Sequence, residues 1–77
     1  MKMISKTVTP EYAESMIKTE ALYLANQVTR NIFHDETCQW KLDGYLKAYE
    51  ELELIDFSVR PKAFKMYRDD ISASQTH

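Results

Sequence analysis

The chain has 77 residues, of which 44% are hydrophobic and 12% aromatic, and its ten Lys and Arg against twelve Asp and Glu leave a net charge of −2. This length allows a single domain, the hydrophobic content is too high for a disordered chain, and the near-balance of charges indicates neither a nucleic-acid footprint nor an acidic tail. The longest apolar run, residues 21–25, is far shorter than the ~20 residues that cross a membrane.

The first predicted helix covers residues 10–33. Only one glycine occurs between Pro10 and Pro61, and the apolar residues recur at three- and four-residue steps, which is the spacing of one helix face. Thr9 can cap this helix with its hydroxyl, because Pro10 then occupies the first helical position, where an N–H is not needed. The apolar stripe consists of Ala13, Ile17, Ala21, Leu24, Val28 and Ile32.

The second predicted helix covers about residues 37–54, and Asp35 or Thr37 is expected to cap it. Gly44 weakens such a helix by up to about 1 kcal/mol relative to alanine, unless it serves a close backbone approach, for instance to the first helix. A short connection between two long helices favours an antiparallel hairpin. The apolar seam of the second helix consists of Cys38, Leu42, Tyr45, Tyr49 and Leu52.

A third, shorter helix is predicted over about residues 59–71. The preceding segment, 55–60, alternates apolar and polar residues as a strand does. A single strand has nothing to pair with, so we interpret it as a turn. Ser58 is expected to cap the third helix, which places Pro61 in the first turn, where its missing N–H is harmless.

The whole chain, residues 1–77, is therefore predicted to be one all-α domain, built from an antiparallel helical hairpin and a shorter third helix. Its ends, about 1–8 and 72–77, are expected to be frayed. A core of this size is marginal. Either the third helix or a second copy of the chain must then cover the remaining apolar surface, and we favour the second interpretation, a homodimer.

Protein binding is the function that the sequence favours. More large apolar residues are present than a narrow seam between two helices covers, and Tyr and Trp are favoured at interfaces. Acidic residues at the end of the second helix oppose its dipole. They could mark a surface for a basic partner, although nearby lysines or solvent could also neutralise them. The expected contact residues of this small interaction module or regulator are Tyr23, Trp40, Tyr45, Tyr49, Glu50, Glu51 and Glu53.

Nucleic-acid binding is the alternative function. Four basic residues lie within nine positions of the third helix and alternate with aromatic residues, so they could contact phosphates. The acidic pair at 69–70 follows them directly and would repel a phosphate backbone, which makes this the weaker hypothesis. The basic residues are Arg60, Lys62, Lys65 and Arg68.

A metal or thiol site is the third hypothesis, and it rests on His34 and Cys38. The two residues are four apart, but a structural zinc site needs four ligands, and a nucleophile needs a base that is itself oriented. Gly44 stands alone, so no glycine-rich phosphate loop is present. We therefore predict no enzymatic activity and no cofactor. A single cysteine is typical of a reducing compartment, so we expect the protein to be cytoplasmic.

Overall fold

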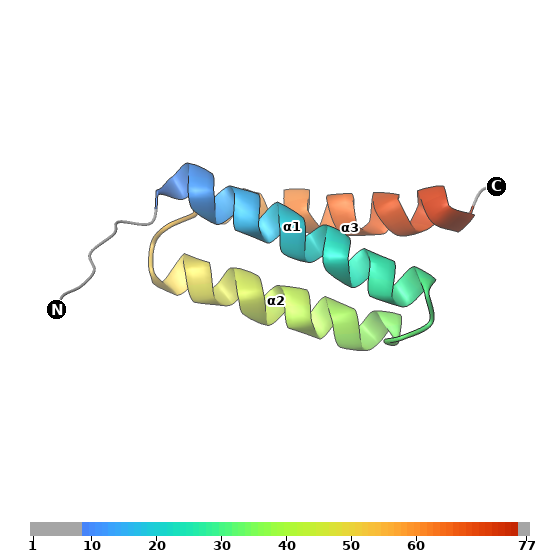
Figure 1. The fold of residues 1–77 in the computed structure, drawn as a ribbon. Helices are drawn as coiled ribbons and strands as arrows, with labels where there is room; N and C mark the ends of the chain where they lie inside the picture. The colour runs from blue at the N-terminus through green and yellow to red at the C-terminus, as the bar shows by residue number, and fades with distance from the viewer. Residues whose placement is uncertain (1–8, 76–77) are drawn as a thin grey trace, which may run out of the picture.

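The computed structural model describes residues 9–75 and contains three α-helices in that part of the chain. α1 covers Pro10–Thr29, α2 covers Asp35–Glu51 and α3 covers Val59–Gln75. α1 and α2 form an antiparallel hairpin, and α3 then runs in the same chain direction as α1 (Figure 1). No strand occurs among residues 9–75. The predicted all-α fold with its helical hairpin is confirmed.

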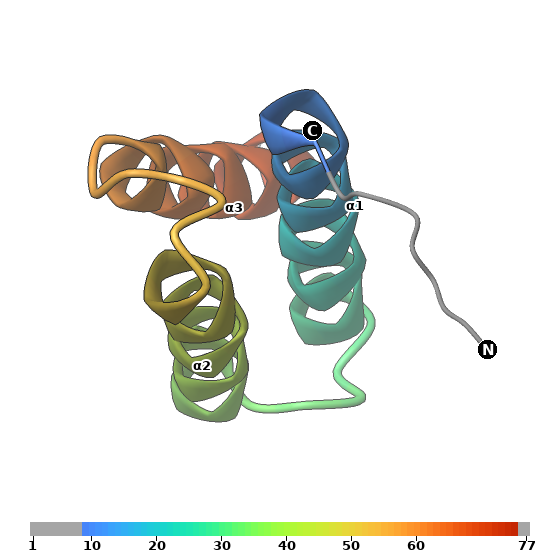
Figure 2. The same ribbon diagram turned by 90° about the vertical axis from the view of Figure 1, so that its left-hand side faces the viewer.

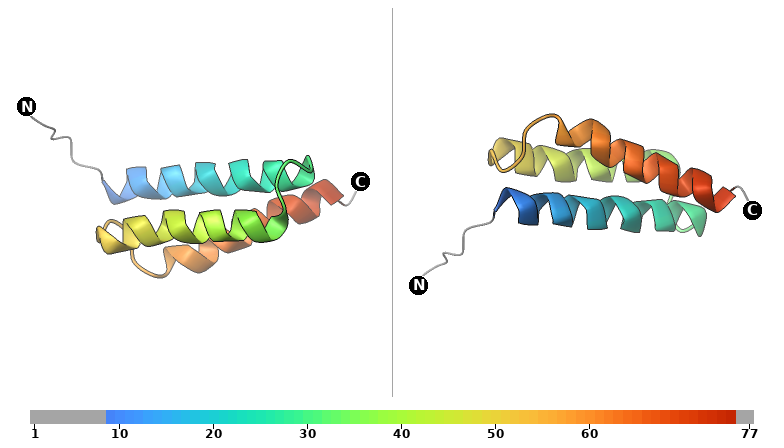
Figure 3. Two further views of the ribbon diagram at one scale, coloured as in Figure 1. Left: turned by 90° about the horizontal axis from the view of Figure 1, so that it is seen from below. Right: turned by 90° about the horizontal axis from the view of Figure 1, so that it is seen from above.

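α3 lies across one side of the α1–α2 pair (Figures 2 and 3). Its contacts with α1 are the most extensive in the molecule, those between α1 and α2 are fewer, and those between α2 and α3 are fewest. Within the described chain, no helix lies on the opposite side of the α1–α2 pair (Figure 2). The core between the helices consists of Ile17, Ala21, Leu24, Ala25, Cys38, Leu42, Leu46, Val59, Ala63 and Tyr67.

The start of α1 is the one that the sequence predicts. Thr9 is the N-cap, and its hydroxyl oxygen accepts the backbone N–H of Tyr12 at 3.1 Å. Pro10 is the first helical residue. The first N–H groups of a helix have no partner within the helix. Thr9 accepts one of them and Pro10 lacks one, so this prediction is confirmed.

α1 ends at Thr29, four residues before the predicted end at 33. Asn31 has a φ of 62°, in the left-handed region, and the N–H of Ile32 donates to the carbonyl of Gln27 at 2.9 Å. These are the features of a Schellman motif, in which asparagine is a common alternative to glycine. Ile32 continues the apolar spacing of the helix in the sequence, but it lies beyond the helix end and is exposed.

α2 covers Asp35–Glu51 rather than 37–54, and it ends in the same motif. Glu53 has a φ of 60°, and the N–H of Leu54 donates to the carbonyl of Tyr49 at 3.1 Å. A glutamate in the left-handed conformation is strained, because its Cβ approaches the following carbonyl group. This position therefore costs free energy that a glycine would not.

The starts of α2 and α3 differ from the predicted caps. The N-cap of α2 is His34, which makes no side-chain capping bond, so the predicted cap at Asp35 or Thr37 is wrong. Before α3, Ser58 is a donor rather than a cap. Its backbone N–H donates to Asp56 Oδ1 at 2.8 Å, and its hydroxyl donates to the same oxygen. These two bonds lower the pKa of the Asp56 carboxyl, and they fix the turn into α3.

α3 has 17 residues, as many as α2. It continues four residues past the predicted end at 71, so the structure makes residues 72–75 helical where the sequence predicts a frayed end. The other segments that were expected to be frayed, 1–8 and 76–77, lie outside the described residues.

Gly44 is exposed on α2, and no atom lies within 4 Å of the place where a Cβ would stand. The close approach of α1 that would have explained this glycine is absent. Among residues 9–75, no helix has both the length and the apolar character that spanning a membrane requires.

Candidate functional site

The residues expected to contact a partner occupy separate places on the molecule. Tyr45 and Tyr49 pack partly buried against the core, with their ring centroids 5.4 Å apart in an edge-to-face arrangement. Trp40 precedes Tyr45 by five residues, which turns it by about 140° around the helix, and it is 73% exposed. Glu50 turns toward α3, and Glu53 lies beyond the end of α2.

Two tyrosines of α1 point to the side that α3 leaves uncovered. Tyr12 and Tyr23 are eleven residues apart, about three helical turns, so they lie on the same side of α1. They are 55% and 51% exposed. Glu14 lines the groove between α1 and α3, and Tyr23, nine residues later, is turned about 180° from it. The exposed tyrosines are therefore on the far side of α1 from α3.

Tyr12 of α1 lies near Tyr45 of α2 on this side. Burial, and then the nearby Tyr49, Glu20 and Tyr12 in that order, raise the pKa of Tyr45 to about 12. A phenol with this pKa stays neutral at ordinary pH and can donate a hydrogen bond. We call this surface the aromatic face and define it as Tyr12, Tyr23, Tyr45 and Tyr49.

A cation borders the aromatic face at the end where α1 turns into α2. Lys41 lies one helical turn before Tyr45 and therefore on the same side of α2. Its ammonium group stands 5.4 Å from the centroid of the Phe33 ring, a distance typical of a cation–π contact. The face thus has an aromatic centre, with Glu20 on α1 and Lys41 on α2 as its charged neighbours.

The acidic residues at the end of α2 do not form one surface. Arg60 of α3 binds Glu50 through two bonds of 2.8 and 3.1 Å, and it also binds Asp43. The side chain of Glu50 is only 8% exposed, and its hydrogen bond is the main cause that raises the pKa of Arg60. Glu50 therefore joins α2 to α3. Glu51 is exposed and lines a shallow hollow with Phe57.

The basic residues of α3 do not form one surface either. Arg60 is bound to α2, and Lys65 lies 2.9 Å from Asp69 of its own helix. Lys62 and Arg68 are exposed. At 100° per residue the four directions spread over about 200° of the helix circumference. The geometry therefore offers no single basic stripe that would suit a phosphate backbone.

His34 and Cys38 do not converge on a ligand. Cys38 is fully buried in the core, and this burial raises the pKa of its thiol. His34 is exposed at the start of α2. Among residues 9–75, no group of three or more His, Cys, Asp or Glu side chains could hold a metal ion. The hypothesis of a thiol or metal site gains no support.

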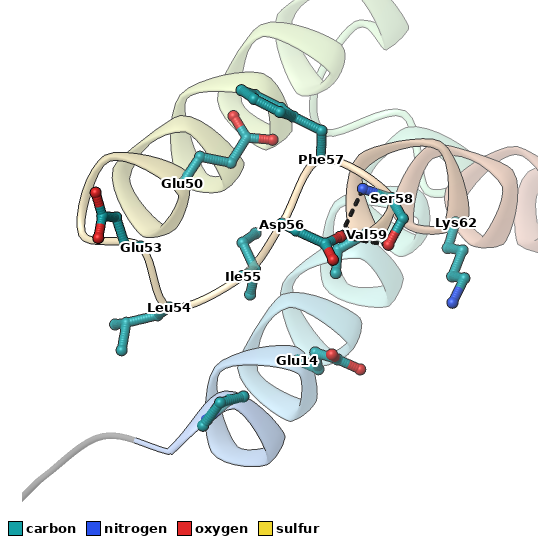
Figure 4. A pocket seen from close by; sticks show the side chains of 11 residues that line it. Glu14, Glu50, Glu53, Leu54, Ile55, Asp56, Phe57, Ser58, Val59 and Lys62 are labelled. Carbon is teal, nitrogen blue, oxygen red and sulfur yellow. Dashed lines mark hydrogen bonds between the residues drawn. The ribbon is translucent and has the colours of Figure 1, made fainter.

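A pocket of about 640 Å³ lies where the start of α1, the end of α2 and the start of α3 come together (Figure 4). We call it the corner pocket. Sequence reasoning missed it, because its lining comes from three segments that are distant in the chain. The one signal was the alternating segment 55–60, which we interpreted only as a turn. The apolar part of its lining consists of Pro10, Leu54, Ile55, Phe57 and Val59.

No family model matches this chain, and neither a curated protein nor a solved structure matches it. Function must therefore be inferred from the residues and from their arrangement. Two surfaces are available for this: the aromatic face, which the sequence predicts in part, and the corner pocket, which it does not.

Proposed function

We propose that this chain is a small helical interaction module that binds another protein through its aromatic face. The observation that carries this proposal is the exposure of Tyr12 and Tyr23 on the side of the α1–α2 pair that α3 leaves open. Tyrosine combines a large apolar area with a hydroxyl, and it is enriched at interfaces and among the residues that dominate binding energy.

The two tyrosines of α2 form the partly buried part of this surface. Tyr45 and Tyr49 are held against the core and against each other, so a partner meets rings whose positions are already restricted. Binding then costs less conformational entropy than it would on a mobile surface.

A second copy of this chain is the partner that we propose first. A core formed by 77 residues is marginal on its own, and a dimer would bury apolar surface that α3 does not reach. A two-fold axis brings the same face onto itself. Because Glu20 and Lys41 border the face, self-association can bring opposite charges together at the rim.

The test is sedimentation velocity from low to high micromolar concentration. We expect a concentration-dependent dimer for the parent chain, and a dissociation constant raised at least about tenfold by Tyr12→Ser with Tyr23→Ser. Two control variants should leave the dissociation constant unchanged. Lys18→Ser changes a residue on the α3 side of α1, and Trp40→Ser also removes an exposed aromatic side chain, but from another face of α2.

Two results would count against the proposal. A chain that stays monomeric at every concentration contradicts the homodimer. Capture of a partner protein that binds the double tyrosine variant as well as the parent chain contradicts the aromatic face itself. Regulation through such binding, a cytoplasmic location and the lack of catalytic activity belong to the same proposal.

A further inference from the structure

The corner pocket has an apolar floor and comes from all three helices. Pro10 lies at the start of α1, Leu54 and Ile55 lie in the connection after α2, and Val59 begins α3. Its volume of about 640 Å³ is within the range of about 300–1,000 Å³ that is usual for pockets that take a ligand.

Carboxylates surround this floor. Glu14 lines the pocket from α1, and Glu53 and Asp56 line it from the connection after α2, with Glu14 and Glu53 on opposite sides, whereas Lys62 is the one cation of the lining (Figure 4). Glu50 also lines it, but Arg60 neutralises that charge. Glu14 and Glu53 have no ion pair among residues 9–75. The pocket therefore carries an excess of negative charge.

Phe57 stands at the border of the pocket and is the most exposed large apolar residue of the described chain, at 74%. The bonds between Asp56 and Ser58 fix the backbone on both sides of it. It also lines the neighbouring hollow with Lys47 and Glu51. An exposed aromatic ring that borders two hollows is suited to contact part of a bound segment.

We propose that the corner pocket binds a segment of a partner protein in which a lysine or arginine stands next to a large apolar side chain. The apolar side chain would fill the floor between Leu54 and Val59, and Phe57 would contact the segment at the border of the pocket. The cation would meet Glu14 on one side of the floor or Glu53 on the other (Figure 4), both of which the chain leaves without ion pairs. Charge complementarity excludes an acidic or phosphorylated segment. This proposal goes beyond the aromatic face and does not rest on it.

The test is fluorescence anisotropy with the full chain and three short labelled peptides of equal length. One peptide alternates lysine with leucine, the second lysine with serine and the third glutamate with leucine. We expect measurable binding of the first, weakened by added salt, and binding of the other two that is at least about tenfold weaker because each lacks one of the two recognised features.

Variants then locate the binding site. Glu14→Gln with Glu53→Gln should weaken the lysine–leucine peptide about fivefold, while Glu36→Gln with Asp70→Asn, an equal change of charge elsewhere, should not. Phe57→Ala should weaken it about tenfold, while Trp40→Ala, a residue with the same exposure, should not. The variant with Tyr12→Ser and Tyr23→Ser should bind the peptide normally, so this site and the aromatic face can fail independently.

Several results would overturn the proposal. Equal binding of the lysine–leucine and glutamate–leucine peptides would remove the role of charge. Unchanged affinity in the Glu14→Gln, Glu53→Gln and Phe57→Ala variants would remove the site. Binding that occurs only after deletion of residues 1–8, which contain two lysines, would make that segment of the chain the occupant instead of a partner protein.

Discussion

α3 is joined to its two neighbours in different ways. Against α1 it packs through apolar residues: Ile17 lines the groove toward Val59 and Ala63. Ala21 and Ala25 follow on the same stripe, and both are fully buried. Small side chains let two helices approach closely, which explains why this contact is the most extensive in the molecule.

Against α2, α3 makes the fewest contacts, and a polar contact stands at each end of the pair. Arg60 binds Glu50 near the start of α3, and the hydroxyl of Tyr67 donates to Asp35 Oδ1 at 2.5 Å at the other end of the contact. Apolar burial is spread over many atoms and has no preferred direction, whereas each of these bonds depends on a single pair. The position of α2 against α3 therefore depends on few side chains, while that of α1 depends on a whole surface.

The largest expected effect is a break in the apolar contact. Ile17→Ala should lower the free energy of unfolding by about 3 kcal/mol, because a buried isoleucine is removed and a cavity remains. Urea denaturation followed by circular dichroism measures this. Lys18→Ala, at the exposed neighbour, should change stability by less than about 0.5 kcal/mol. Equal effects of the two variants would mean that the α1–α3 contact does not carry the fold.

The next effect breaks the polar contact. Arg60→Met keeps the apolar stem but leaves the nearly buried Glu50 without its partner, and we expect a loss of about 2 kcal/mol. Lys65→Met breaks the exposed pair with Asp69 and should cost less than about 0.5 kcal/mol. Adding Glu50→Met to Arg60→Met should recover most of the loss, because no unpaired charge then remains. Failure to recover would show that more than the ion pair is lost.

The contrast between the two contacts also explains what could be predicted from the sequence. The apolar spacing of Ile17, Ala21 and Leu24 is local, so it indicated the helix and its buried stripe. The pairing of Tyr45 with Tyr49 is local as well. By contrast, Arg60 and Glu50 are ten residues apart across a turn, and no local rule brings them together.

Helix ends and open faces were the weaker part of the prediction. Ile32 continues the apolar spacing of α1, so the spacing predicts a helix that runs past Asn31. Asparagine is nevertheless a recognised helix-ending residue. Trp40 and Tyr23 are both aromatic, so the sequence alone assigns them to one contact surface. Long-range packing decides which side of the α1–α2 pair is covered by α3. Only the structure therefore shows that Trp40 and Tyr23 lie on different faces of the molecule.

A smaller effect tests the second polar contact. Tyr67→Phe should lower stability by about 1 kcal/mol at neutral pH, because the bond to Asp35 is lost while the ring stays in place. Burial, and then Asp35, raise the pKa of Tyr67 above its usual value of 10. The unfolded chain therefore ionises first, and the stability that Tyr67 supplies is complete below pH 10 and is lost as pH rises above it.

The measurement is the urea midpoint across this alkaline range. We expect it to fall less steeply for Tyr67→Phe than for the parent chain, since one of the shifted phenols is gone. Tyr45→Phe should also flatten the curve between pH 10 and about 12, because burial raises that pKa as well. A slope unchanged by either substitution would contradict the burial of these phenols.

The smallest expected effect is a gain in stability at the end of α2, the helix that makes the fewest contacts with α3. Glu53→Gly should raise the free energy of unfolding by about 0.5 kcal/mol, because glycine adopts the left-handed conformation without the strain of a Cβ. Ala48→Gly, an exposed position inside α2, should instead cost about 1 kcal/mol. Glu53 also supplies a carboxylate to the corner pocket. The stabilised variant should therefore bind the lysine–leucine peptide more weakly, and a parallel gain in both properties would contradict the role assigned to that charge.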